Sequence, residues 1–245
     1  MEKYVVFPNA PITEALLDIR AELPKEIDLS TLESFHDLVR DRFPEKEQRF
    51  VFSSGFQLSP GSVSQPPGKQ TADGYLFRSP AEGKVVQARL NGFTFNKLRP
   101  YKDWETFCGE ARTLWDHYTK VAKPVRVTRI ALRYINKIDI PLPMKDFKEY
   151  ILTAPEIAPR LPQSLAHFFF RLVIPRHDIG TVAVITETIE AASGKSLPLI
   201  FDIDVFAETV FVDDAGMWKH FDVLREFKNE VFFESLTDKA KELFK

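Results

Sequence analysis

Hydrophobic and polar residues alternate along several stretches of the chain, a pattern that predicts β-strands. In residues 11–22, Ala15, Leu17 and Ile19 fall on one side and polar residues fall on the other. The same pattern marks residues 49–58, 75–78, 85–90, 93–98, 125–140, 166–174, 181–189 and 199–206. Asn91-Gly92 separates two of these runs and is typical of a hairpin turn, because both residues tolerate a positive φ. Antiparallel hairpins are therefore expected.

Apolar residues at helical spacing predict four helices. The first begins at Ser30, where Glu33 completes a capping box. Its apolar stripe consists of Leu32, Phe35, Leu38, Val39 and Phe43. Two long helices are expected, one after the N-cap residue Asp103 and one that starts near Asp213 or Asp214, and a short helix in residues 144–152.

Both halves of the chain show the same order of elements: strand, helix, three or four antiparallel strands, long helix. The predicted fold class is α+β, with an internal duplication that divides the chain into residues 1–124 and 125–245, packed as one compact body. Strands joined in hairpins favour antiparallel sheets with helices on one side. This order occurs in TATA-binding-protein-like and helix-grip folds. Residues 59–74, rich in Gly, Pro and Ser, are predicted to form a mobile loop.

Four segments resemble a sporadically distributed family of uncharacterised bacterial and archaeal proteins of about this length. They are NAPITEAL (residues 9–16), RYINKI (133–138), DID (202–204) and NKLRPYKDW (96–104). The resemblance covers nearly the whole chain. It implies a prokaryotic, cytoplasmic protein, and the family's patchy distribution implies mobile elements such as toxin–antitoxin or phage-defence genes. It carries no catalytic residue over to this chain.

The composition of the chain argues against several classes of protein. The formal net charge of −2 over 245 residues argues against bulk electrostatic capture of nucleic acid or anionic membrane. No apolar run approaches the roughly 20 residues that span a bilayer. A single cysteine, Cys108, excludes an intramolecular disulfide and fits a reducing compartment, and its place on an apolar stripe indicates a buried side chain. A cytoplasmic protein is expected.

No recognisable catalytic motif is present, so the sequence favours a protein that is not an enzyme. The five histidines are scattered without metal-ligand spacing, and neither a metal site nor a cofactor is predicted. Asp202 and Asp204 leave a metal-dependent transferase as the last alternative.

The most informative feature is a charged face of the predicted sheet. Arg129, Arg133 and Lys137 are spaced by four and share one side of a strand, because side chains alternate with period two. The polar sides of other strands carry Glu14, Arg20, Asp202 and Asp204. One interpretation is a surface that binds a partner segment or an anionic ligand; the other is a set of cross-strand salt bridges facing solvent.

The leading functional hypothesis is a non-enzymatic binding or accessory protein that uses this face on a protein partner, within a defence or toxin–antitoxin gene pair. The alternative is nucleic-acid binding by tandem saddle-like sheets, with Phe93, Phe95, Lys97 and Arg99 as further contacts. The same four residues also fit a strand that leaves the core and ends in solvent. A third hypothesis is a small-molecule binder with a cavity between the sheet and a long helix.

Overall fold

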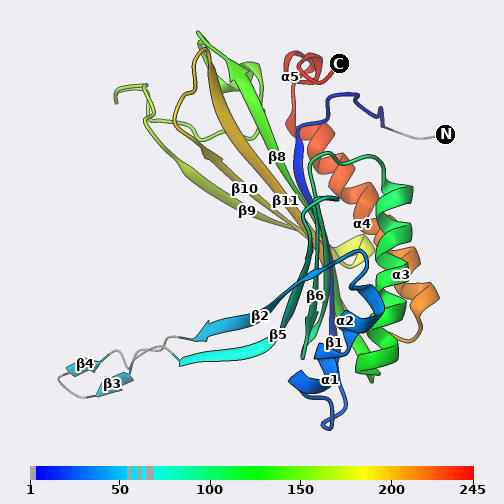
Figure 1. Ribbon diagram of the computed structural model, residues 1–245. Coiled ribbons are helices and arrows are strands. Elements are labelled where there is room, and N and C mark those ends of the chain that lie inside the picture. Colours follow the sequence, from blue (N-terminus) through cyan, green and yellow to red (C-terminus); the bar gives the residue numbers. More distant parts are fainter. Residues whose placement is uncertain (1–3, 54–56, 60–61, 65–68) are drawn as a thin grey trace. The chain divides into compact units, whose positions relative to one another are not determined.

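The computed structural model describes residues 4–53, 57–59, 62–64 and 69–245 (Figure 1). The protein is α+β. Nine antiparallel strands form a sheet in the order β2-β5-β6-β7-β1-β8-β11-β10-β9, and β3 and β4 pair separately. Contacts divide the chain into unit 1 (Met1–Leu17, Lys97–Lys102 and Thr128–Lys245) and unit 2 (Asp18–Asn96 and Asp103–Val127). The duplication and the division at residue 124 stay predictions.

The strands and helices have the following bounds. The strands are β1 (Ile12–Glu22), β2 (Glu45–Ser53), β3 (Gln57–Ser59), β4 (Ser62–Ser64), β5 (Lys69–Ser79), β6 (Lys84–Arg89), β7 (Gly92–Leu98), β8 (Arg126–Pro141), β9 (Phe169–Arg176), β10 (Thr181–Ile189) and β11 (Ser196–Phe211). The helices are α1 (Leu29–Glu33), α2 (Phe35–Val39), α3 (Trp104–Ala122), α4 (Asp214–Ser235) and α5 (Asp238–Glu242), with short 3₁₀ turns η1 (Phe147–Glu149) and η2 (His177–Ile179).

Unit 1 is built on β8, β11, β10 and β9, with α4 packed against β11 and β10 (Figure 1). The Asp213 side chain caps α4 by accepting a hydrogen bond from the amide of Gly216 at 2.6 Å. Alternate residues of β11 are buried together with the apolar stripe of α4. These are Leu199, Phe201, Ile203, Val205, Met217, Phe221, Leu224 and Val231. The other face of these strands therefore lies opposite α4.

Unit 2 has its core between β6, β7 and α3. Phe93 packs against Trp115 and Tyr118 of α3, with ring centroids 5.9 and 5.7 Å away. Gly92 begins β7 with φ of 141°, and a Cβ there would lie 2.0 Å from the carbonyl oxygen of Ile19. The hairpin predicted around residues 91–92 is confirmed, and its glycine also lets β1 approach closely.

The first helix starts earlier than the sequence predicted. Asp28, not Ser30, is the N-cap, because its carboxylate accepts from the Thr31 amide at 2.8 Å. The Ser30 hydroxyl itself donates to Asp28, also at 2.8 Å. The predicted helix is two short helices, α1 and α2, and Leu38 is exposed, whereas the rest of the predicted stripe is buried.

Two further predictions change. The predicted helix in residues 144–152 is only the 3₁₀ turn η1. The predicted loop in residues 59–74 instead contains β4 and the start of β5; its residues 60–61 and 65–68 lie outside the described residues. Among the helices described, none is both long and apolar enough to cross a membrane.

Candidate functional site

The strands of unit 1 present one face away from α4. Register places Arg171 of β9 beside Thr186 of β10, and Thr186 beside Asp202 of β11. The next row contains Val173, Val184 and Asp204. We call this surface the open face of unit 1; it comprises Arg129, Arg133 and Lys137 of β8, Asp202, Asp204 and Phe206 of β11, Val182, Val184 and Thr186 of β10, and Phe169, Arg171 and Val173 of β9.

Arg133 and Asp202 form the central ion pair of the open face. The Arg133 Nε and Nη2 donate to the two carboxylate oxygens of Asp202, at 2.8 and 2.5 Å. The hydrogen bond with Asp202, with added attraction from the charges of Asp202, Asp204 and Glu14, raises the pKa of Arg133 above its ordinary value. Arg133 keeps 44% of its side chain exposed while that of Asp202 is 12% exposed. The arginine therefore covers its carboxylate but remains reachable from solvent.

Arg129 lies among acidic and aromatic side chains of β11. Its Nη2 is 3.9 Å from Asp204 Oδ2 and its Nε is 3.7 Å from Glu208 Oε1. The guanidinium also lies over the Phe206 ring, with 4.5 Å between the carbon Cζ and the ring centroid. This arrangement holds the Arg129 charge against β11 and reduces its availability to a polyanion.

The remaining residues predicted for the charged face fall into two groups. Lys137 donates to Glu190 Oε2 at 2.6 Å, an ion pair that raises the pKa of Lys137. Glu14 belongs to unit 1, where its charge acts on Arg133. Arg20 belongs to unit 2, where its Nε donates to Asp18 Oδ1 at 3.2 Å. The structure thus brings six of the seven residues into unit 1, where the cations meet carboxylates.

The outer part of the open face differs from this neutralised centre. Phe169 and Val173 on β9 are 68% and 53% exposed. Arg171 lies between them on the same side of the strand and is exposed. Within the described residues it forms no ion pair, unlike the three cations that β8 contributes to the open face. Sequence reasoning did not single out Arg171 as a site residue.

The four residues predicted as further contacts for nucleic acid do not share one exposed surface in the structure. Phe93 and Phe95 are fully buried, and Phe95 stacks on Phe107 with ring centroids 5.3 Å apart. Their rings offer no surface on which a base could stack, so the prediction is corrected for these two residues: they belong to the core. Lys97 is partly exposed and Arg99 is exposed, as expected for a strand that ends in solvent.

Two charged groups, one buried and one half-buried, were missed by the sequence reasoning. Glu187 of β10 has no exposed surface, and neither of its carboxylate oxygens has a hydrogen-bond partner among the described residues. Burial raises the pKa of Glu187 to about 8. The sequence contained a signal of this burial, because Glu187 falls on the same side of the alternating strand as the apolar residues Ala183, Ile185 and Ile189.

Lys228 of α4 is the half-buried group. Its Nζ lies 4.0 Å from the ring centroid of Tyr134, whose hydroxyl is 2.8 Å from that of Tyr101. Burial, with repulsion from Arg225, lowers the pKa of Lys228 to about 7, although the ring favours the charged form. Lys228 continues the apolar stripe of α4 at helical spacing, which is the signal that could have revealed it.

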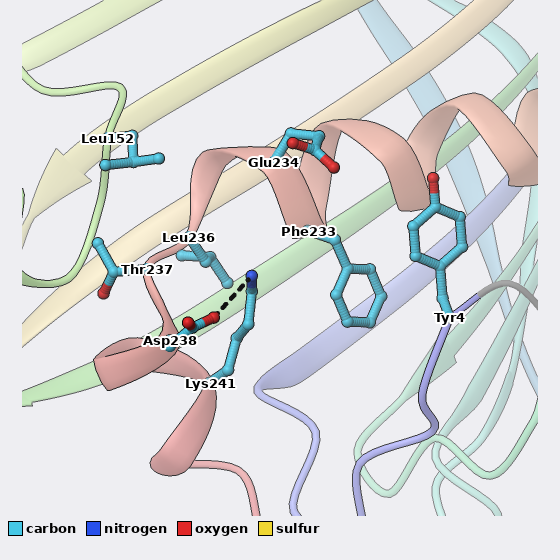
Figure 2. A pocket seen from close by; sticks show the side chains of 8 residues that line it. All are labelled: Tyr4, Leu152, Phe233, Glu234, Leu236, Thr237, Asp238 and Lys241. Atoms are coloured by element: carbon cyan, nitrogen blue, oxygen red, sulfur yellow. Dashed lines mark ion pairs between the residues drawn. The ribbon is translucent and has the colours of Figure 1, made fainter.

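A surface pocket of about 540 Å³ lies where α4 ends and α5 begins (Figure 2). Among its lining residues, Tyr4 stacks on Phe233 with ring centroids 4.8 Å apart. At its rim, Lys241 Nζ is 3.5 Å from Asp238 Oδ1. Leu152, Glu234, Leu236 and Thr237 complete the lining. This pocket is not the cavity between sheet and helix that the small-molecule hypothesis requires.

The described residues contain no group of three or more His, Cys, Asp or Glu side chains placed to hold a metal ion. Asp202 is instead engaged by Arg133. Comparisons with family models and with curated proteins give no match to this chain.

Proposed function

We propose that this protein is a non-enzymatic accessory protein that binds a protein partner through the open face of unit 1. The supporting observation is the combination of neutralised charge and exposed apolar surface on one face. Arg133 and Lys137 are hydrogen-bonded to carboxylates, while Phe169 and Val173 are exposed nearby on β9. Protein–protein interfaces commonly join exposed aromatic and aliphatic side chains to arginines in such a mixture.

The same charges give less support to the nucleic-acid alternative. A phosphate that approaches Arg133 has to compete with Asp202, whose two oxygens already accept from the guanidinium. The net charge of −2 adds no long-range attraction for a polyanion. Tandem saddle-like binding of nucleic acid therefore stays a prediction, to be separated by salt-dependent retention on DNA or RNA.

The biological setting of the proposal comes from the resemblance to a patchily distributed prokaryotic family. A member of a defence or toxin–antitoxin gene pair acts on the product of a neighbouring gene. A binding protein without catalytic groups fits the accessory role in such a pair. The partner is accordingly expected among the products encoded next to this chain.

The proposal is tested by co-expression with each adjacent gene, followed by native mass spectrometry and light scattering. A stoichiometric complex is expected. Arg133→Glu should abolish it, because the new carboxylate faces Asp202, Asp204 and Glu14. Arg126→Glu is the matched control: Arg126 is also on β8 and also pairs with a carboxylate, Glu22 at 2.7 Å, but it belongs to unit 2.

Folding of each variant is checked by circular dichroism and thermal unfolding, and Arg133→Gln serves if the charge reversal unfolds. A complex that survives both Arg133 variants would contradict binding through the centre of the open face. The proposal would be overturned if the protein stayed monomeric in the presence of each protein encoded by an adjacent gene. Salt-sensitive binding to nucleic acid in place of a protein complex would also overturn it.

A further inference from the structure

β9 is the last strand in the order of the sheet. It pairs with β10 along eight residues without a break in register, from Phe169 opposite Thr188 to Arg176 opposite Thr181. Within the described part of the chain, no strand pairs with its other edge. The outward-directed amide and carbonyl groups of an edge strand form a template for one more strand.

Pro175 indicates which residues of β9 point their backbone groups outward. Proline has no amide N–H, so within a sheet it occupies edge positions whose N–H side faces away from the neighbouring strand. Residues that share the phase of Pro175 are Phe169, Arg171 and Val173, since backbone orientation alternates with period two. Their amides and carbonyls accordingly face the vacant edge.

Proteins usually protect such an edge with lysines, bulges or inward-pointing charges. β9 contains no lysine, and its pairing with β10 is regular. It exposes Phe169, Val173 and Ile174 instead, and only Pro175, near the end of the strand, opposes pairing. An edge of this composition is either an aggregation hazard or a site of strand addition.

Arg171 gives the edge a charge preference. It lies between Phe169 and Val173, and its neighbour on the adjacent strand β10 is Thr186. Within the described residues, no carboxylate pairs with it. A strand added beside β9 places one of its side chains directly next to Arg171. An acidic residue there gains an ion pair, and apolar residues two positions away cover Phe169 and Val173.

A second copy of this chain is the less suitable occupant. β9 contains no Asp or Glu, so two β9 strands paired through their edges bring no carboxylate to Arg171. We propose that the vacant edge of β9 accepts an extended strand of the protein partner, with an Asp or Glu beside Arg171 and apolar side chains beside Phe169 and Val173. This inference rests on the proposed function and specifies how the partner is bound.

The test uses two fluorescent nine-residue peptides of alternating threonine and valine. One has glutamate in place of the central valine, and the other has lysine there. The full-length protein should bind the glutamate peptide about fivefold more tightly, the ratio that one favourable cross-strand ion pair provides. Bound peptide should slow hydrogen exchange at the amides of residues 169, 171 and 173.

Four variants sharpen the test. Arg171→Glu should reverse the preference between the two peptides, whereas Arg160→Glu, which makes the same charge change at an exposed loop arginine, should not. Val173→Pro should abolish binding of both peptides by removing an outward N–H, whereas Val173→Thr, which keeps it, should not. Arg171→Glu keeps the test decisive if the proline variant fails to fold.

Equal affinity for the two peptides, no binding of either, or exchange protection away from β9 would overturn strand addition. The two proposals are separable with the co-expressed partner. A complex lost in Arg133→Glu but kept in Arg171→Glu and Val173→Pro refutes the strand-addition model and leaves binding through the open face intact. The opposite pattern refutes binding through the centre of the face and supports the edge.

Discussion

The carboxylate of Asp202 holds the guanidinium of Arg133 by two hydrogen bonds, although 69 residues separate the two in the chain. Because Asp202 is largely buried, its charge depends on this arginine for compensation. A carboxylate so placed contributes both to folding and to the local charge of the open face.

Asp202→Asn should therefore lower the free energy of unfolding by about 1–2 kcal/mol, since it removes a charge-assisted pair whose arginine can still turn to water. The measurement is urea unfolding followed by circular dichroism. Glu190→Gln is the control, because Lys137 and Glu190 are both more exposed than Asp202, and it should change stability by only about 0.3 kcal/mol. Equal losses in the two variants would contradict this reasoning.

Because Glu187 is buried, we expect the free energy of unfolding to fall as pH rises. In the folded protein burial raises its pKa from 4.5 to about 8, while the unfolded chain releases the proton near 4.5. The stabilisation is thus complete below pH 4.5 and is lost progressively up to about pH 8, a total on the order of 5 kcal/mol. Glu187→Gln cannot ionise and should be less sensitive to pH over this range.

The measurement is the free energy of unfolding of both proteins at pH 5, 7 and 9. Glu190→Gln removes an exposed carboxyl just after β10 and should follow the wild-type protein. If Glu187→Gln runs parallel to wild type as well, Glu187 is charged in the folded state and the assignment is wrong.

Lys228 predicts a dependence of the opposite sign. Its pKa falls to about 7 in the folded protein, mainly through burial, while an unfolded lysine titrates near 10.5. Wild-type stability should therefore rise between pH 7 and 10.5, as the unfolded chain loses its extra proton. Lys228→Met should stabilise the protein most at pH 6, and the difference from wild type should shrink by pH 10.

The control for this experiment is Lys219→Met, which removes an exposed lysine of the same helix. Its effect should be small and constant with pH. A Lys228→Met curve that keeps a constant offset from wild type would show that the amine titrates normally.

Gly92 predicts strong intolerance of any side chain. A Cβ at this position meets the Ile19 carbonyl oxygen at 2.0 Å, and the φ of 141° is itself unfavourable for other residues. Gly92→Ala should lower the free energy of unfolding by at least about 2 kcal/mol. Gly109→Ala in α3 meets no atom within 4 Å and should instead raise it by up to about 1 kcal/mol. Melting temperatures that move in the same direction would refute this pair of predictions.

Local signals in the sequence were sufficient for much of the fold. Asp103 caps α3 as expected, and α4 is capped by Asp213, one of the two predicted starting residues, because an N-cap needs only the amides of the next turn. The alternation in β8 correctly separated Arg133 from Tyr134, since the faces of a strand follow directly from its period. The N-cap of the first helix was misplaced at Ser30, because Asp28 is also a capping residue type and only the hydrogen bonds of the folded chain select it.

Local sequence patterns could not predict the contacts between residues of the open face. Pairing of Arg133 with Asp202 depends on β8 lying next to β11, which strand order alone decides. The isolation of Arg171 follows from the register of β9 on β10, which places Thr186 beside it. Glu187 and Lys228 were visible as charged residues in apolar phases, but their burial depends on how α4 packs on the sheet.

The makeup of unit 1 also has a consequence for biosynthesis. Residues 1–17 belong to the same unit as residues 128–245, and the amide of Asn9 donates to the carbonyl of Phe244 at 3.0 Å. On the ribosome, more than a hundred residues must be made after β1 begins before β8 and β11 exist. Closing such a long loop makes folding slow and leaves early apolar segments exposed. The early part of the chain should therefore depend on chaperones until the last strands emerge.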